Sequence, residues 1–288
     1  MSVQGVSVGS AQLTGETLQQ VTNSRSMSLE NVEYTYDKDA PIKSGADGTV
    51  YFAKSTSGDE VCIKEAKPQG VPSLKNESSA LDALGVHASI VSKKGFEEGS
   101  SRLALEKYDG ALNDSELLQK TDLGTRGQWL AHVRDGVEHM HGVGIAHGDI
   151  NSKNILHKDG RAVITDFGSA KDYRDTDEVM VSLTFEVDGF EETVQQPLSR
   201  GDAIQVDQEA YIQLAYNVLA GRGTDAAMPG KDEGVGQLGG LPDGARKLAE
   251  EVFFGTAGVA ERYGKVPELL HALNAKGPTV EQHFGDMV

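Results

Sequence analysis

Two short segments concentrate the side chains that are best suited to chemistry. The run HGDINSKN at 147–154 contains Asp149 and Asn154, and the run DFG at 166–168 contains Asp166. A carboxylate can orient an attacking hydroxyl, and carboxylate and amide oxygens are hard ligands that suit Mg²⁺. In-line phosphoryl transfer needs both kinds of group and little covalent help from a protein. Either run alone is typical of a turn, but together, separated by a predicted hairpin over 155–164, they favour phosphoryl transfer.

The two runs resemble the catalytic loop and the magnesium-binding motif of protein kinases. The resemblance implies that Asp149 orients the substrate hydroxyl and accepts its proton, while Asn154 and Asp166 hold Mg²⁺. It also implies that Lys153 neutralises the transferring phosphate, since tyrosine kinases carry a basic residue at that offset. The cofactors expected from the resemblance are therefore ATP and Mg²⁺.

The resemblance continues upstream in the order that a kinase requires. Gly45, Gly48 and Val50 match the later part of the kinase glycine-rich loop, although Lys43 stands where its first glycine would be. Glycine allows backbone to approach phosphate oxygens without a clash at Cβ. Taken alone, this run would be only a glycine turn.

The next run, Val61-Cys62-Ile63-Lys64, resembles the kinase motif V-A-I-K. The resemblance makes Lys64 the phosphate-binding lysine. Glu77 on the following predicted helix becomes its ion-pair partner, although the interval between them is shorter than the family's. A lone lysine on a strand would otherwise be a solvated charge, and a lone glutamate a surface residue.

The run LALEKY at 103–108 resembles the hinge that reads adenine through backbone hydrogen bonds. Plain hydrophobic core is the alternative interpretation of its apolar residues. The adenine-contacting residues implied by the resemblance are the gatekeeper Leu105, the hinge residues Glu106 and Tyr108, the roof residues Val50 and Cys62, and the floor residue Leu156.

Further downstream, residues 207–221 resemble the buried helix that supports the catalytic loop of kinases. Asp207 is expected to accept hydrogen bonds from the backbone of that loop. Arg262 resembles an arginine that protein kinases carry late in the C-lobe. The resemblance covers roughly residues 40 to 275.

Several departures from the family pattern bear on regulation. Gly148 replaces the arginine that normally receives a phosphorylated activation loop, and no A-P-E motif is present, the nearest remnant being at 195–197. That remnant lacks the glutamate that would pair with Arg262. Residues 172–192 carry eight acidic side chains against Arg174 alone. A solvated loop and an unusual β-hairpin turning at 188–189 are both open for this segment.

The elements that position these residues follow from periodicity. Alternation over 32–36 and the apolar runs 50–53, 61–64, 90–91 and 103–105 predict strands, and a turn at 55–59 predicts a hairpin. Apolar residues at helical spacing predict helices over 73–84 and from Trp129 to Met140. Glycine-rich sequence from 221 to 244 predicts that the next helix is reduced or absent. The expected class is α+β, with a bilobal kinase-like fold: an N-lobe over about 31–107 and a helical C-lobe over about 108–280.

Residues 1–30 are polar, with few charges, and predict a flexible tail. The tail also resembles the start of bacterial type III effectors, so a secretion signal is an alternative and localisation is open between the cytoplasm and a host cell. The chain of 288 residues has a formal charge of −17, which argues against nucleic acid and leaves open a basic partner or a solubility role. No run is apolar enough to span a membrane. Cys62 is the single cysteine, so no internal disulfide is possible.

Three functions are compatible with these motifs. The first is a protein kinase acting on Ser, Thr or Tyr, in the manner of a diverged bacterial effector, active constitutively or through an activating partner. The second is an aminoglycoside- or choline-type phosphotransferase, which shares the pattern H-G-D-x-x-x-x-N. The third is a pseudokinase binding module. Asp207, Arg262 and the D-F-G glycine favour the first over the second, and retention of Lys64 and Asp149 disfavours the third.

Overall fold

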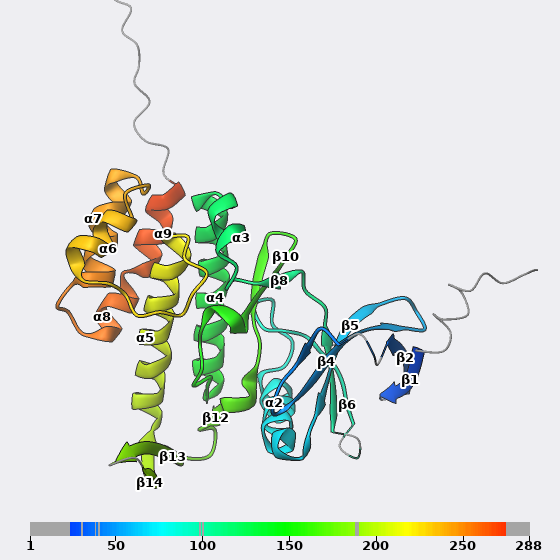
Figure 1. Ribbon diagram of the computed structural model, residues 1–288. Coiled ribbons are helices and arrows are strands. Elements are labelled where there is room, and N and C mark those ends of the chain that lie inside the picture. The colour runs from blue at the N-terminus through cyan, green and yellow to red at the C-terminus, as the bar shows by residue number, and fades with distance from the viewer. Residues whose placement is uncertain are drawn as a thin grey trace, which may run out of the picture. The chain divides into compact units, whose positions relative to one another are not determined.

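Figure 1 shows the computed structural model, which describes residues 24–29, 31–37, 39, 41–97, 99, 101–187 and 190–274. The chain divides into two compact units. The first comprises Met1–Val71 and Lys94–Lys107, and the second comprises Pro72–Lys93 and Tyr108–Val288. The β-rich amino-terminal part and the helical carboxy-terminal part confirm the predicted α+β class.

The first unit is built on an antiparallel sheet with the strand order β1-β2-β4-β5-β7-β6, and β3 pairs with β4. Tyr34 and Tyr36 on β2 are buried while their neighbours are exposed, which is the period of two predicted from sequence. The predicted hairpin turn closes where the Ser55 N–H donates to the Asp59 carbonyl at 2.9 Å. The strands are β1 (Ser24–Leu29), β2 (Val32–Asp37), β3 (Lys43–Ser44), β4 (Gly48–Ser55), β5 (Glu60–Ala66), β6 (Lys93–Glu97) and β7 (Arg102–Glu106).

Strand β1 lies within the range that the sequence predicts to be a tail. Met27 and Leu29 are 5% and 1% exposed and join the core of the sheet, so their burial explains why residues 24–29 are ordered. The rest of the predicted tail lies outside the described residues.

The second unit is mostly helical, and Figure 1 shows the long helices α4 and α5 running side by side through it. The Tyr211 hydroxyl on α5 donates to the Leu130 carbonyl of α4 at 2.9 Å. None of the described helices is both long enough and apolar enough to cross a bilayer. The helices, of which α2 begins at the border of the first unit, are α2 (Val71–Leu84), α3 (Ser115–Lys120), α4 (Leu123–Val143), α5 (Arg200–Leu219), α6 (Lys231–Gln237), α7 (Asp243–Phe254), α8 (Val259–Gly264) and α9 (Val266–Asn274).

Short strands and 3-10 turns frame the two motif-bearing segments. The predicted hairpin after the 147–154 loop is formed by β10 and β11. The predicted hairpin over the acidic segment is formed by β13 and β14, which pair from Glu178 with Ser199 to Val187 with Phe190. These elements are β8 (Gly110–Ala111), β9 (Ile145–Ala146), η2 (Ser152–Asn154), β10 (Ile155–Lys158), β11 (Arg161–Ile164), η3 (Phe167–Ser169), β12 (Lys171–Asp172), β13 (Glu178–Val187) and β14 (Phe190–Ser199).

Two details differ from or refine the sequence prediction. Residues 90–91 do not form a strand: Ile90 makes a single parallel bridge to Ile164, because β11 ends there. After the long helix α5, the glycine-rich sequence carries only the short helix α6, which confirms the predicted reduction.

Candidate active site

The 147–154 loop is anchored at its start by a buried carboxylate. Asp207 on α5 is 0% exposed, and it accepts hydrogen bonds from the backbone N–H of His147 at 2.7 Å and of Gly148 at 2.8 Å. The imidazole of His141 lies 2.9 Å from the same carboxylate. The predicted role of Asp207 as the backbone acceptor of this loop is therefore confirmed.

Gly148 has a backbone reason to be glycine. Its φ is +76°, and a Cβ at this position would lie 3.2 Å from the Ser169 carbonyl oxygen. Left-handed backbone strains residues that carry a Cβ. The absence of the family's arginine thus accompanies a local conformation that favours glycine.

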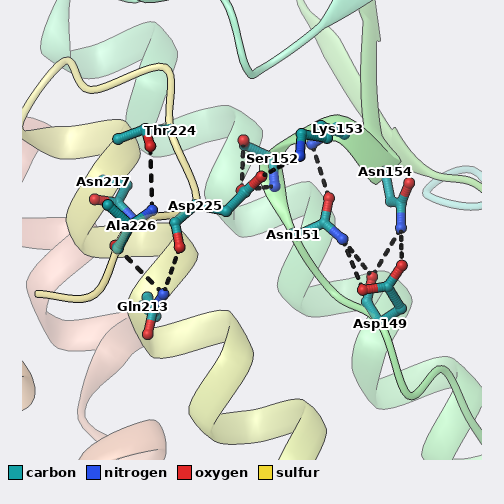
Figure 2. A network of polar contacts seen from close by, with 10 residues as sticks. All are labelled: Asp149, Asn151, Ser152, Lys153, Asn154, Gln213, Asn217, Thr224, Asp225 and Ala226. Carbon is teal, nitrogen blue, oxygen red and sulfur yellow. Dashed lines mark hydrogen bonds and ion pairs between the residues drawn. The ribbon is translucent and has the colours of Figure 1, made fainter. Parts of the chain in front are cut away.

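Two amides hold the Asp149 side chain, as Figure 2 shows. Asn154 Nδ2 donates to the Asp149 carboxylate and to its carbonyl, both at 2.9 Å. Asn151 Nδ2 donates to the other carboxylate oxygen at 2.8 Å. The carboxylate is therefore fixed in direction by two uncharged donors, and the part played by Asn151 was not predicted.

The 166–168 motif lies against this loop. The Thr165 N–H donates to the Asn154 carbonyl at 2.9 Å, and the Thr165 carbonyl lies 3.0 Å from His147 Nε2. Thr165, the residue directly before Asp166, is therefore hydrogen-bonded to both His147 and Asn154 of the loop. Asp166 itself has φ +67° and ψ +62°, a left-handed conformation that is uncommon for residues other than glycine.

An amide on α2 holds the turn that follows Asp166. Asn76 Nδ2 lies 3.3, 3.0 and 2.9 Å from the carbonyl oxygens of Phe167, Gly168 and Ala170. Phe167 is fully buried and its ring lies 4.8 Å from that of His147. Sequence reasoning singled out the neighbouring Glu77, which is 2% exposed, and missed Asn76, whose only signal was its place beside Glu77.

Lys153 lies at the exposed edge of the loop, with 65% of its side chain accessible. Its ammonium is 3.6 Å from the carboxylate of Asp225, in the segment between α5 and α6. Asp225 also lines a small pocket of about 120 Å³ with Ile150 and Asn151 of the loop. Nothing in the sequence motifs pointed to Asp225.

In the first unit, the residues expected to contact nucleotide share one face of the sheet. Val50 is the cross-strand partner of Lys64, and Cys62 that of Leu105. Cross-strand partners lie on the same face, as do residues two apart on a strand. Tyr51, on the opposite face, belongs to the hydrophobic core.

The glycines of the predicted phosphate loop have different surroundings. A Cβ on Gly48 would lie 2.6 Å from the Glu65 carbonyl oxygen, so only glycine fits against β5. Gly45 has open space at its Cβ position, and its N–H donates to the Gly48 carbonyl at 2.9 Å. The Lys67 ammonium donates to the Gly45 carbonyl at 2.6 Å and thereby stabilises this turn.

The other expected adenine contacts lie on both units. Glu106 ends β7 in the first unit and pairs with Val61, whereas Tyr108 begins the next segment of the second unit. Leu156 on β10 pairs with Ala111 and is half-buried. Among the described residues, no cluster of three or more His, Cys, Asp or Glu side chains could hold a metal ion by itself. This is compatible with Mg²⁺, which proteins hold through one or two carboxylates plus substrate phosphates.

Comparison with known proteins identifies the family. Residues 36–187, just over half of the chain, match the family model described as the protein kinase domain. The chain is 29% identical over 142 residues to the serine/threonine-protein kinase/endoribonuclease ire-1 of Caenorhabditis elegans, covering 45% of this chain and 15% of that protein. It is 28% identical over 189 residues to the MAP kinase kinase kinase win1 of Schizosaccharomyces pombe, covering 56% of this chain and 12% of that protein.

A plant relative gives a similar result. The chain is 33% identical over 125 residues to the mitogen-activated protein kinase kinase kinase 20 of Arabidopsis thaliana, covering 38% of this chain and 35% of that protein. The chain thus spans between about an eighth and a third of the length of these relatives. On the family match, the chain belongs to the protein kinase domain family, whose members are phosphotransferases.

Proposed function

We propose that this protein transfers the γ-phosphate of ATP to Ser, Thr or Tyr hydroxyls of a partner protein, with Mg²⁺ as the metal. The observation that carries the proposal is the fixation of Asp149 by Asn151 and Asn154. A carboxylate held in one direction can orient an attacking hydroxyl and accept its proton, which is the main demand that phosphoryl transfer places on side chains.

Asn154 and Asp166 are the proposed magnesium ligands. The amide nitrogen of Asn154 is engaged by Asp149, and in Figure 2 its amide oxygen points away from that carboxylate. An amide oxygen and a carboxylate are the hard ligands that Mg²⁺ prefers. Mg²⁺, when bound, would neutralise charge on the phosphate oxygens. We assign to Lys153 the neutralisation of the phosphate during transfer.

Nucleotide binding is assigned to residues of both units. Lys64 would contact the phosphates, with Glu77 as its ion-pair partner, and the turn at Gly45 and Gly48 would approach them through its backbone. The shared sheet face of Val50, Cys62 and Leu105 supports a role in contacting adenine. Glu106, Tyr108 and Leu156 complete the proposed adenine site.

A protein acceptor is favoured over a small molecule by the anchor that Asp207 provides and by relatives named as serine/threonine-protein kinases. The acidic residues of the 172–192 segment suit a basic acceptor protein. Action as a secreted effector in a host cell, with an activating partner, is the proposed biological setting, and it rests on the composition of residues 1–30.

The test is incubation of the protein with labelled ATP, Mg²⁺ and a eukaryotic lysate, followed by identification of the labelled species. Label on protein hydroxyls is expected, and the Asp166→Ala variant is expected to give none. Label confined to small metabolites would instead support the aminoglycoside- or choline-type alternative. Absence of label with the wild-type protein would support a binding module.

A further inference from the structure

Asp225 binds the 147–154 loop through three groups. Its Oδ1 accepts hydrogen bonds from the backbone N–H of Ser152 at 2.7 Å and from the Ser152 hydroxyl at 2.6 Å. Its Oδ2 lies 3.6 Å from the Lys153 ammonium. Ser152 is 0% exposed, so the two bonds to it are shielded from water. One carboxylate therefore holds the two residues immediately before Asn154.

Asp225 is itself held by helix α5. Gln213 Nε2 lies 3.0 Å from the Asp225 carbonyl and 3.3 Å from the Ala226 carbonyl. Asn217 Nδ2 donates to the same Ala226 carbonyl at 3.1 Å, and the Ala226 N–H donates to the Thr224 hydroxyl at 3.1 Å. Figure 2 shows this chain of contacts running from α5 to Asp149. The segment around Asp225 is thus fixed to a long, buried helix.

Helix α5 consequently holds the loop at both ends. Asp207 binds the backbone of His147 and Gly148 at the start, and Asp225 binds Ser152 and Lys153 at the end. Asp149 lies between these two anchors. The η2 turn (Ser152–Asn154) sets where Asn154 Nδ2 meets the Asp149 carboxylate, because Asn154 is the last residue of that turn.

We infer that Asp225 is a positioning residue for phosphoryl transfer, which keeps Asn154 on Asp149 and directs Lys153. This inference rests on the proposed function. Displacements of about 1 Å in a catalytic group can lower a rate by about a hundredfold. The Lys153 side chain of this ion pair is 65% exposed, so the pair contributes little to stability. Loss of the charge on Asp225 should therefore affect the rate rather than the folded state.

Two variants separate the roles of the Asp225 carboxylate. Asp225→Asn keeps an oxygen for Ser152 and loses the charge that faces Lys153, whereas Asp225→Ala loses both. Asp232→Asn is the matched control, because it removes one exposed negative charge on α6, outside the contacts that hold the loop. Asp225→Asn and Asp232→Asn should show melting temperatures close to that of the wild type. Asp225→Ala should melt at a lower temperature, because it leaves the buried N–H and hydroxyl of Ser152 without an acceptor. The variants are compared at equal concentrations of active sites, as determined by titration with ATP.

The first readout is hydrogen–deuterium exchange in the full-length protein and does not depend on activity. The Ser152 amide should exchange at least about tenfold faster in Asp225→Ala, since loss of its acceptor exposes the N–H to water. Asp225→Asn and Asp232→Asn should keep wild-type protection. Unchanged exchange in Asp225→Ala would overturn the claim that Asp225 holds the loop.

The second readout is steady-state transfer to a protein acceptor. Asp225→Ala should lower kcat by about ten- to a hundredfold with the KM for ATP changed by less than about threefold, and Asp225→Asn should lie between it and the wild type. Wild-type kcat in Asp225→Ala, or an effect that appears only in KM, would overturn the inference about Asp225 and leave the proposed function standing. A wild-type protein without transfer would overturn the proposed function and, with it, the catalytic part of the inference.

Discussion

The guanidinium of Arg262 on α8 donates a hydrogen bond of 2.7 Å to the carboxylate of Glu209 on α5. The sequence lacks the activation-segment glutamate that kinases pair with this arginine, and the structure shows that α5 supplies a carboxylate instead. Arg262 also donates to the carbonyls of Ala257 at 3.2 Å and of Val252 at 3.3 Å. The arginine therefore ties α8 to α5 and to the end of α7, independently of the hairpin β13–β14.

Replacement of Arg262 by Ala should destabilise the protein. Only 12% of its side chain is exposed, so the variant would leave two backbone carbonyls and a carboxylate without their donor. Lost hydrogen bonds with buried partners cost about 1–3 kcal/mol in the free energy of unfolding. Urea denaturation would measure the loss. The control is Glu209→Gln, which should cost less than about 1 kcal/mol because Glu209 is 45% exposed. Equal losses in the two variants would contradict this division of roles.

Burial raises the pKa of the Cys62 thiol, and the charges of Lys107 and Lys64 only partly oppose this. Because the thiolate is the nucleophile, alkylation at neutral pH should be slower than for an exposed cysteine, and its acceleration should come at a higher pH than for that cysteine. Because the pKa of the Cys62 thiol is higher in the folded state than in the unfolded state, the neutral thiol adds to the free energy of unfolding when the pH is below the thiol's pKa in the unfolded chain. That contribution is lost as pH rises through the folded value. A Cys62→Ala variant should lack this part of the alkaline loss of stability in melting curves.

Alkylation also tests the proposed adenine contact. ATP with Mg²⁺ should slow the labelling of Cys62 in the wild-type protein, because bound adenine would cover the thiol. Cys62→Ala, the residue usual in the family at this place, should retain transfer activity. Mass spectrometry of the labelled peptide gives the rate. Equal labelling rates with and without ATP would remove Cys62 from the proposed site.

Activity should not require phosphorylation of the 172–192 segment. Gly148 has no side chain that could receive a phosphate, and its φ of +76° disfavours replacement by a residue that carries a side chain. Arg174, the single basic residue of the segment, is already bonded to Asp172 at 2.6 Å, and this bond lowers the pKa of the Asp172 carboxyl. Phosphatase-treated protein should keep wild-type transfer rates. Loss of activity that is restored by phosphate at Ser182 or Thr184 would refute the prediction.

The sequence was informative where a motif and a periodic pattern agreed. The β4–β5 hairpin, helices α2 and α4, and the anchoring of the loop by Asp207 follow from such agreement. Strand β1 was missed because polar composition outweighed the alternation of Met27 and Leu29, whose burial depends on pairing with β2. The ion pair of Arg262 was missed because its partner comes from another helix.

The polar residues around the candidate site show a different limit. Asn76, Asn151 and Asp225 act through polar contacts to backbone or to neighbouring side chains, and such contacts leave no periodicity in a sequence. Asp225 lies more than 70 positions after Ser152, in a glycine-rich segment for which the sequence predicts only a reduced or absent helix. Only the folded chain brings these residues together.

The most direct test of the proposed function is Asp149→Ala. In the proposed role, the carboxylate would orient the acceptor hydroxyl and contribute little to holding ATP, so nucleotide affinity should stay close to wild type. The transfer rate should fall by about 10²–10⁴-fold, a loss specific to the transition state. Asn151→Ala should show a smaller loss in kcat, because Asn154 still donates to the same carboxylate. Calorimetric titration with ATP and single-turnover transfer assays separate binding from chemistry. A parallel loss of ATP affinity in Asp149→Ala would contradict the assigned role.

The acceptor preference is the last prediction and concerns charge. The acidic residues of the 172–192 segment should favour basic peptides through Coulomb attraction, chiefly by raising the rate of association. Exposed charges are screened over about 10 Å at 0.1 M salt, so the preference should be strong at low salt and fade as salt is raised. Peptides of one sequence that differ only in Lys or Gln at positions flanking the acceptor provide the comparison. If kcat/KM is the same for both peptides at low salt, the acidic segment does not select the acceptor, and the proposal of a basic partner fails while phosphoryl transfer itself stands.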